Sequence, residues 1–215
     1  MKGLIIKDIR LIKNMKNSIL MILLISIGMG AYLKDASFII VYLSIIGATF
    51  TSSTMSYDEF DNGYSFLFSL PVTRKGYVAE KYCFGMLLCG GGWLLGAIVA
   101  VTAGIMRNTL SITDGILMAL MMVPIPLILL SVLLPFHFKF GGEKGRVAMA
   151  AAMGLMFVVV IAGAKILSAL QIDLDAVSVP LQGVGASTAG AIIIGVLCIL
   201  LSCRISMGIL EKKEF

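Results

Sequence analysis

Six long stretches without Asp, Glu, Lys or Arg dominate this sequence of 215 residues. Each stretch is close to the ~20 residues that an α-helix needs to cross about 30 Å of hydrocarbon. None alternates polar and apolar residues as the strands of a membrane barrel do. A mean hydropathy of +1.02 and a charged fraction of 13% are also typical of integral membrane proteins. We therefore expect one all-α polytopic membrane domain over residues 1–215, with spans at 17–33, 36–57, 82–106, 115–138, 147–164 and 176–203.

The lysines and arginines are distributed unevenly between the two sides that six spans would create. The two ends and the connections on their side carry 14 of the 17, and the opposite side carries only Lys34, Arg107 and Lys165. Since cytoplasmic loops hold the excess of Lys and Arg, we expect both termini to be cytoplasmic. The net charge of +5 then follows from topology and does not indicate a nucleic-acid partner.

The N-terminal arm, residues 1–16, has the pattern of an amphipathic helix that lies along the membrane surface. Most of its apolar residues fall on one helical arc, and Lys7, Arg10 and Asn14 fall on the other. Ile6 and Asp8 do not fit this pattern. The alternative interpretation is a basic anchor that only sets the topology.

Small residues recur at every fourth position of the third predicted span. They are Gly92, Gly96, Ala100 and Gly104. This spacing forms a groove along one helix face, so it predicts a close contact with another helix. The contact could lie within one subunit or across a dimer.

Two further features predict bent or interrupted helices. Pro124 and Pro126 each remove a backbone donor from the fourth span, so we expect a kink near its middle. The outer connection at 168–185, which contains Pro180, is expected to be a short external helix or a re-entrant element.

The chain offers little catalytic or metal-binding chemistry. It has no H-E-x-x-H, G-x-S-x-G or G-x-x-x-x-G-K-[ST] motif, and its four cysteines have no C-x-x-C spacing. The single histidine, His137, lies between Phe136 and Phe138, as in an interfacial aromatic cluster. No Asp, Glu, Lys or Arg lies inside a predicted span, and His137 is at the inner end of one, which argues against a proton or sodium relay. We expect no metal site, no cofactor in this chain and no ATP hydrolysis by this chain alone.

The longest predicted cytoplasmic segment, residues 57–81, is rich in aromatic side chains. Three acids lead an apolar run that ends before Pro71, and Arg74 and Lys75 follow it. Acids at the start and bases after the end suit a helix dipole, so a short amphipathic helix is expected. Its exposed aromatic residues need a partner or the membrane surface to cover them. The alternative is a solvated loop with interfacial tyrosines.

The run LFSLPVTRKGYVAEKY, which leads into the third span, and the basic opening MKGLIIKDIRLIKN resemble the small ABC-2-type permeases of bacteria. These are the membrane subunits of ATP-driven exporters, and the resemblance covers essentially the whole chain. Within the family, the chain is similar to exporters of amphipathic peptides such as phenol-soluble modulins, and to permeases that give resistance to bacitracin or lantibiotics. The resemblance implies a multi-pass protein of the bacterial plasma membrane that exports amphipathic peptides.

The resemblance also implies that the segment 57–81 carries a coupling helix, which docks on a separate ATPase subunit. The residues in or near this helix would be Asp58, Glu59, Phe60, Tyr64, Phe66 and Phe68, with Leu70, Pro71, Arg74 and Tyr77 shaping its return to the membrane. Two permeases, identical or sister subunits, would pair above two ATPases that hold ATP and Mg²⁺.

Two other classes of function remain open at this stage. The chain could be a membrane accessory or immunity protein that binds a peptide or another membrane subunit without transporting it. It could also be an intramembrane enzyme, although the absence of paired acids or histidines inside the spans argues against that class.

Overall fold

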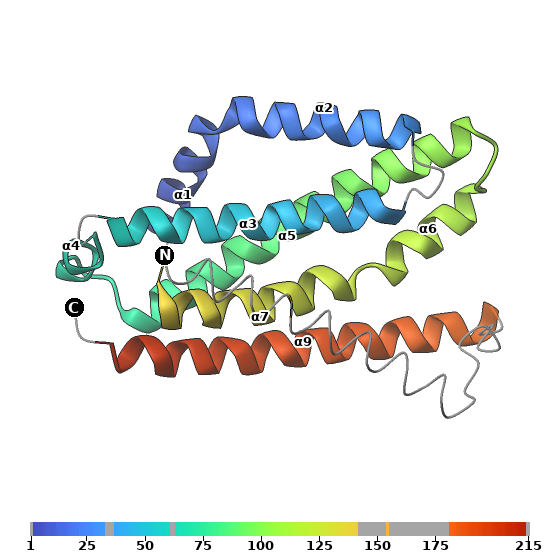
Figure 1. Cartoon of the computed structure of the whole chain (residues 1–215). Helices are drawn as coiled ribbons and strands as arrows, with labels where there is room; N and C mark the ends of the chain where they lie inside the picture. The colour runs from blue at the N-terminus through green and yellow to red at the C-terminus, as the bar shows by residue number, and fades with distance from the viewer. Residues whose placement is uncertain (1, 33–36, 61–62, 142–153, 155–180, 214–215) are drawn as a thin grey trace.

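The computed structural model describes residues 2–32, 37–60, 63–141, 154 and 181–213 (Figure 1). Within these residues every regular element is a helix and no strand occurs. The helices are α1 (Lys2–Asn14), α2 (Lys16–Tyr32), α3 (Ser37–Glu59), α4 (Gly63–Ser69), α5 (Arg74–Met106), α6 (Ile112–Met121), α7 (Pro124–Phe140) and α9 (Leu181–Glu211). The predicted span 147–164, apart from Gly154, and residues 168–180 of the outer connection lie outside the described residues.

Four helical segments are long and apolar enough to cross a membrane. They are Ser37–Glu59, Arg74–Met106, Ile112–Phe140 and Thr188–Glu211. The segments Gly3–Asn14 and Lys16–Tyr32 make a fifth candidate if they count as one span, with a bend of 66° between them. The described part of the chain thus confirms an all-helical membrane protein with four or five candidate spans. The six-span topology and the side of each terminus stay predictions.

The helices form an elongated bundle in which α2, α3, α7 and α9 run along the same long direction (Figure 1). Helix α1 crosses this direction steeply, and α3 packs most extensively on α5 while α7 packs most extensively on α9. Both chain ends and α4 lie at the same end of the bundle, which we call the α4 end. The turn between α5 and α6 lies at the opposite end, where the Arg107 guanidinium donates a hydrogen bond to the carbonyl of Gly30.

Glycines allow α3 and α5 to approach with their backbones almost in contact. A Cβ atom added to Gly47 of α3 would lie 2.6 Å from the carbonyl oxygen of Leu88, and one added to Gly96 of α5 would lie 2.7 Å from the Cα of Ile40. These distances are too short for any side chain without movement of the backbone. The α3–α5 contact within one chain therefore requires glycine at both positions.

The other small residues of the predicted groove have different surroundings. Gly92 faces the carbonyl of Leu43 on α3, and Ala100 is fully buried. Gly104 instead packs against the side chain of Leu110, in the turn that follows α5. The small residues of the predicted groove therefore serve two purposes. Those in the main part of α5 allow a close helix contact, and Gly104 allows a tight turn after the helix.

The fourth predicted span is broken where its prolines lie. Helix α6 ends at Met121 and α7 begins at Pro124, which occupies the first turn of α7. A proline is tolerated there because its missing N–H would have no partner inside the helix. The interruption at 122–123 is the physical form of the kink expected from Pro124 and Pro126.

The close contact of α3 and α5 can be tested with two neighbouring glycines. Gly96→Ala should lower the free energy of unfolding by about 1–3 kcal/mol, because its methyl group would meet the α3 backbone. Gly91→Ala is the matched control, since nothing lies within 4 Å of a Cβ there and alanine favours a helix. Thermal unfolding of the purified protein in lipid nanodiscs would measure both. Equal stability of the two variants would contradict this packing.

Candidate functional site

Four charged side chains from three helices meet at the α4 end. Lys81 of α5 forms ion pairs with Asp8 of α1 and, at 2.9 Å, with Asp58 of α3. Lys7 of α1 forms ion pairs with the same two carboxylates, at 3.2 Å from Asp8 and more closely with Asp58. Positive and negative groups thus alternate, and we call Lys7, Asp8, Asp58 and Lys81 the ion cluster.

Burial makes the pairing within the ion cluster obligatory. The side chains of Asp8 and Lys81 are fully buried, that of Asp58 is 6% exposed and that of Lys7 is 32% exposed. Removing such charges from water costs several kcal/mol per ion unless partners compensate. Two ammonium groups and two carboxylates balance one another here. The buried carboxyl of Glu80 also lies 3.9 Å from the Lys81 ammonium.

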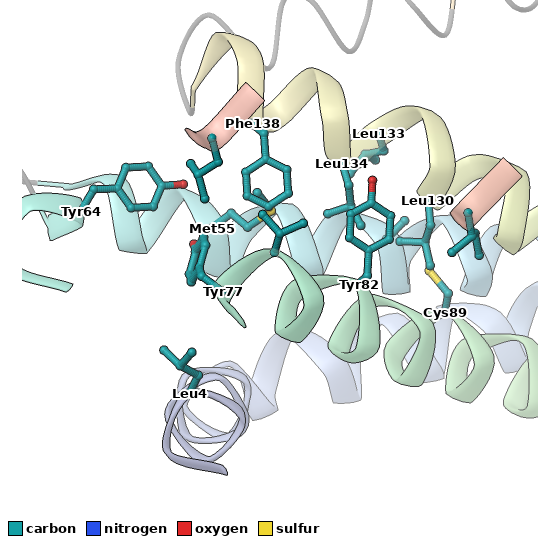
Figure 2. Close-up of a cluster of buried hydrophobic side chains, with 14 of the residues drawn as sticks. Leu4, Met55, Tyr64, Tyr77, Tyr82, Cys89, Leu130, Leu133, Leu134 and Phe138 are labelled. Carbon is teal, nitrogen blue, oxygen red and sulfur yellow. The ribbon is translucent and has the colours of Figure 1, made fainter. Parts of the chain in front are cut away.

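The sequence of α1 explains why Asp8 points into the bundle. Leu4 and Asp8 are four residues apart and therefore lie on the same face of α1. Both are buried, and Leu4 belongs to the main apolar core (Figure 2). Helix α1 is thus held to α3 and α5 by one apolar and one charged contact on the same face.

An aromatic cluster beside the ion cluster supports α4. Tyr77 of α5 is fully buried at its centre, with ring centroids 5.7 Å from Tyr64 and 6.0 Å from Phe68 of α4, and 6.2 Å from Phe138 of α7. All three contacts are edge-to-face, the favourable geometry for aromatic rings. Figure 2 shows Tyr64, Tyr77 and Phe138 converging in this way. The Tyr77 hydroxyl donates a hydrogen bond of 2.9 Å to Asp58, so α4 rests on a ring that is itself attached to the ion cluster.

Tyr64 is held as a neutral phenol in this position. Burial raises the pKa of Tyr64, and the nearby negative charge of Glu59 raises it further. Glu59 lies in turn beside Gly141, where an added Cβ would come 3.2 Å from its Oε2 atom. The end of α3 therefore lies close to the end of α7.

Large apolar side chains are exposed on α4 and in the segments that flank it. Phe66 of α4 is 71% exposed, and its exposed neighbours in sequence are Phe60 at 73%, Tyr57 at 55% and Leu70 at 46%. We call these four residues the exposed aromatic face. Three of them, Tyr57, Phe66 and Leu70, line a groove of about 560 Å³ that is also bordered by Lys7 and Asp58 of the ion cluster.

The structure divides the residues expected in the coupling helix into three groups. Phe60, Phe66, Leu70 and Pro71 are exposed. Asp58, Glu59, Tyr64, Phe68 and Tyr77 are buried or half-buried. Arg74 contacts the end of α9. The helix itself is short, because α3 continues to Glu59 and α5 begins at Arg74.

The ion cluster itself is not anticipated by the sequence analysis. Lys7 is assigned there to the polar arc of the arm, and Lys81 to the positive side of the membrane. One signal was available, since Asp8 does not fit the amphipathic pattern of residues 1–16. An acid out of pattern on an interfacial helix indicates a buried basic partner, here 73 residues away in the chain.

The ion cluster joins α1, α3 and α5. Among the described residues, no group of three or more His, Cys, Asp or Glu side chains could hold a metal ion. His137 is buried in α7, next to the buried Phe138 and the partly exposed Phe136. At the α4 end, the exposed aromatic face is accessible, and α4 itself is supported by the buried aromatic cluster.

Comparison with known proteins gives one family assignment. A family model described as ABC-2 family transporter protein matches residues 3–211, from the first turn of α1 to the last residue of α9. No curated protein and no solved structure matches the chain. The family match therefore includes the ion cluster, α4 and every candidate span.

The obligatory pairing in the ion cluster predicts a large effect of a single substitution. Lys81→Met should cost about 3–5 kcal/mol of stability, because it leaves Asp8 buried with only Lys7 nearby. Adding Asp8→Leu should restore most of that loss, since an apolar pair needs no charge partner. Thermal unfolding in nanodiscs would measure the cycle.

Lys75→Met provides the matched control for Lys81→Met. Lys75 pairs with Glu211 at 3.3 Å, but the two side chains are 68% and 49% exposed, so its loss should cost less than about 1 kcal/mol. A double variant no more stable than Lys81→Met would show that the charges do not depend on each other.

Proposed function

The chain belongs to the ABC-2 family of transporter proteins, multi-pass membrane components that work with a separate ABC ATPase, and from this we propose that it is the permease subunit of an exporter of amphipathic peptides. In this proposal the α4 end is cytoplasmic, as the distribution of Lys and Arg indicates. The protein spans the bacterial plasma membrane six times, with both termini inside. The partner ATPase binds ATP and Mg²⁺, and this chain supplies the path.

The observation that carries the proposal is the contrast between the two sides of α4. One side is fixed by Tyr64 and Phe68 against Tyr77. On the other side Phe66 is more than two-thirds exposed, as is Phe60 in the segment just before α4. Large apolar side chains at a water-facing end of a protein indicate a surface that a partner covers. We propose that α4 is the coupling helix and that the ATPase covers its exposed aromatic face.

The ion cluster supports this function mechanically. A displacement of α4 acts on Tyr77 directly, because Tyr64 of α4 packs on the Tyr77 ring. The Tyr77 hydroxyl donates a hydrogen bond to Asp58. Asp58 is paired with Lys7 and Lys81, so the displacement is shared by α1, α3 and α5. In this proposal Asp58 and Tyr77 act inside the permease and do not touch the ATPase. The expected coupling residues thus separate into a docking set and a transmitting set.

The energy source and the cargo follow from the composition of the spans. Charged side chains lie near the ends of the predicted spans and not inside them, so no relay for a coupling ion is expected. A path between such spans is lined by apolar and small residues, which suits amphipathic peptides. The resemblance of the sequence to phenol-soluble modulin exporters, and to permeases that give resistance to bacitracin or lantibiotics, favours the same class of cargo. We propose that two permeases, identical or sister subunits, form the path together above two ATPases.

Substitutions on the two sides of α4 should separate docking from folding. We expect the double variant Phe60→Asp with Phe66→Asp to insert normally but to bind the ATPase at least about 30-fold more weakly, which is the loss expected from a single aromatic anchor of about 2 kcal/mol. The measurement is binding of the purified protein in nanodiscs to the purified ABC ATPase that acts with it.

The matched control keeps the apolar character of the same two positions. Phe60→Leu with Phe66→Leu should retain binding within about threefold. Phe68→Asp is less informative, because Phe68 packs on Tyr64 and Tyr77 and its loss would disturb the support of α4. Unchanged binding by the double Asp variant would refute docking at this face. A protein that copurifies with lipid alone would instead support the accessory function.

A further inference from the structure

Helix α7 joins the aromatic cluster under α4 through Phe138, whereas none of the rings named in that cluster belongs to α9. The most extensive contacts in the bundle are α3 with α5 and α7 with α9, so the helices form two main pairs. Helix α4 adjoins the first pair, because it follows α3 and precedes α5. Helix α5 is joined to α9 along its length by hydrogen bonds between the Tyr82 hydroxyl and the hydroxyls of Ser202 and Ser206. The very end of α9 has a further connection, which comes from the first residue of α5 and also touches α4.

Arg74, the first residue of α5, provides such a connection. Its Nη1 group donates hydrogen bonds to the main-chain carbonyls of Leu210 at 3.1 Å, Glu211 at 2.8 Å and Lys213 at 2.9 Å. These carbonyls lie at and just beyond the end of α9, where no further turn of helix supplies donors. A cation at this position also interacts favourably with the negative end of the helix dipole. Arg74 is therefore a cap for α9 that comes from another helix.

The same guanidinium lies over a ring of α4. The Arg74 Cζ atom is 5.8 Å from the centroid of the Phe68 ring, which is within the range of a cation–π contact. Phe68 stacks on Tyr64 within α4 and meets Tyr77 edge-on. One side chain thus touches the supporting side of α4 and the end of α9 at once.

The end of the chain is attached to α7 as well. The Lys213 ammonium donates a hydrogen bond of 3.0 Å to the main-chain carbonyl of Phe138. Phe138 also meets Tyr77 edge-to-face, so Lys213 is attached to a residue of the aromatic cluster that supports α4. The segment 210–213 is therefore held by Arg74 and by α7, in addition to the exposed ion pair of Lys75 with Glu211.

We infer that Arg74 is a positioning residue that links the displacement of α4 to the end of α9, so that both helix pairs respond when the ATPase acts on α4. This inference rests on the proposed function, because it takes α4 as the element that the ATPase moves. The planar guanidinium suits the role, since the two N–H bonds of its Nη1 group are shared among the three carbonyls while its Cζ atom lies over the Phe68 ring. A lysine at this position would keep the charge but not this geometry.

Hydrogen–deuterium exchange of the full-length protein in nanodiscs tests the link. In the wild-type protein, binding of the purified ABC ATPase should change the exchange of residues 204–213 by at least about threefold. In Arg74→Gln, the same residues should exchange about tenfold faster without the ATPase and should no longer respond when it is added. Binding of the ATPase should stay within about twofold of wild type, because the exposed aromatic face is unchanged.

Two further variants distinguish the link from a general loss of stability. Lys75→Gln removes the exposed pair with Glu211 in the same region and should keep the full response of residues 204–213. Arg74→Lys should give a partial response, and it replaces Arg74→Gln in the comparison if the glutamine variant does not fold. A response in Arg74→Gln equal to that of the wild type would overturn the link.

The remaining outcomes separate this inference from the proposed function. If the ATPase binds the wild-type protein through α4 but residues 204–213 do not respond, the link is wrong and the proposed function stands. If the ATPase does not bind the wild-type protein, the proposed function is refuted and the inference fails with it. Response in the wild type, its loss in Arg74→Gln and its retention in Lys75→Gln together support the link.

Discussion

The ion pair between Lys81 and Asp8 is the contact on which the α4 end of the molecule depends. Both side chains are fully buried, and either charge alone would carry the cost of leaving water. Because Asp8 is on α1 and Lys81 is on α5, this requirement fixes an otherwise peripheral helix to the bundle. Asp58 of α3 also pairs with Lys81, and Lys7 balances the negative charge of Asp58. Three helices that are far apart in sequence are thereby held together at one point by the need to neutralise buried charge.

That anchorage explains how a helix as short as α4 can exist at all. Seven residues are far too few for a stable isolated helix, so α4 owes its structure to the rings on which it rests. Tyr77 connects those rings to the ion cluster, since its ring meets Tyr64 while its hydroxyl bonds Asp58. Helix α4 therefore packs on the aromatic cluster on one side and is exposed on the other. Such an element can receive force from a partner and pass it inward, which is the mechanical basis of the proposed coupling.

The candidate site could be predicted only in part from the sequence, and Asp58 shows why. Near the end of a span, an acid is compatible with a helix-dipole contact, a place on a docking surface or a buried ion pair. Its actual surroundings depend on Lys7, 51 residues away in the chain, and on Lys81. The same limit applies to Arg74, whose partners lie 136 to 139 residues away. By contrast, Phe66 needs no distant partner to be recognised, because a large apolar residue in a charged connection is conspicuous by itself.

The sequence by itself determined that this chain is a helical membrane protein, that its N-terminal arm begins with a basic helix and that a proline interrupts the fourth apolar block. These properties follow from the hydropathy of successive residues and from the missing backbone N–H of proline. Both can be read from a short segment of the chain without knowing its neighbours in space. Only the tertiary structure decided that Gly96 meets α3, that Asp8 turns inward and that Arg74 caps α9. Each of these depends on which distant residue comes to lie nearby, because close packing and charge pairing are properties of two segments together and of neither one alone.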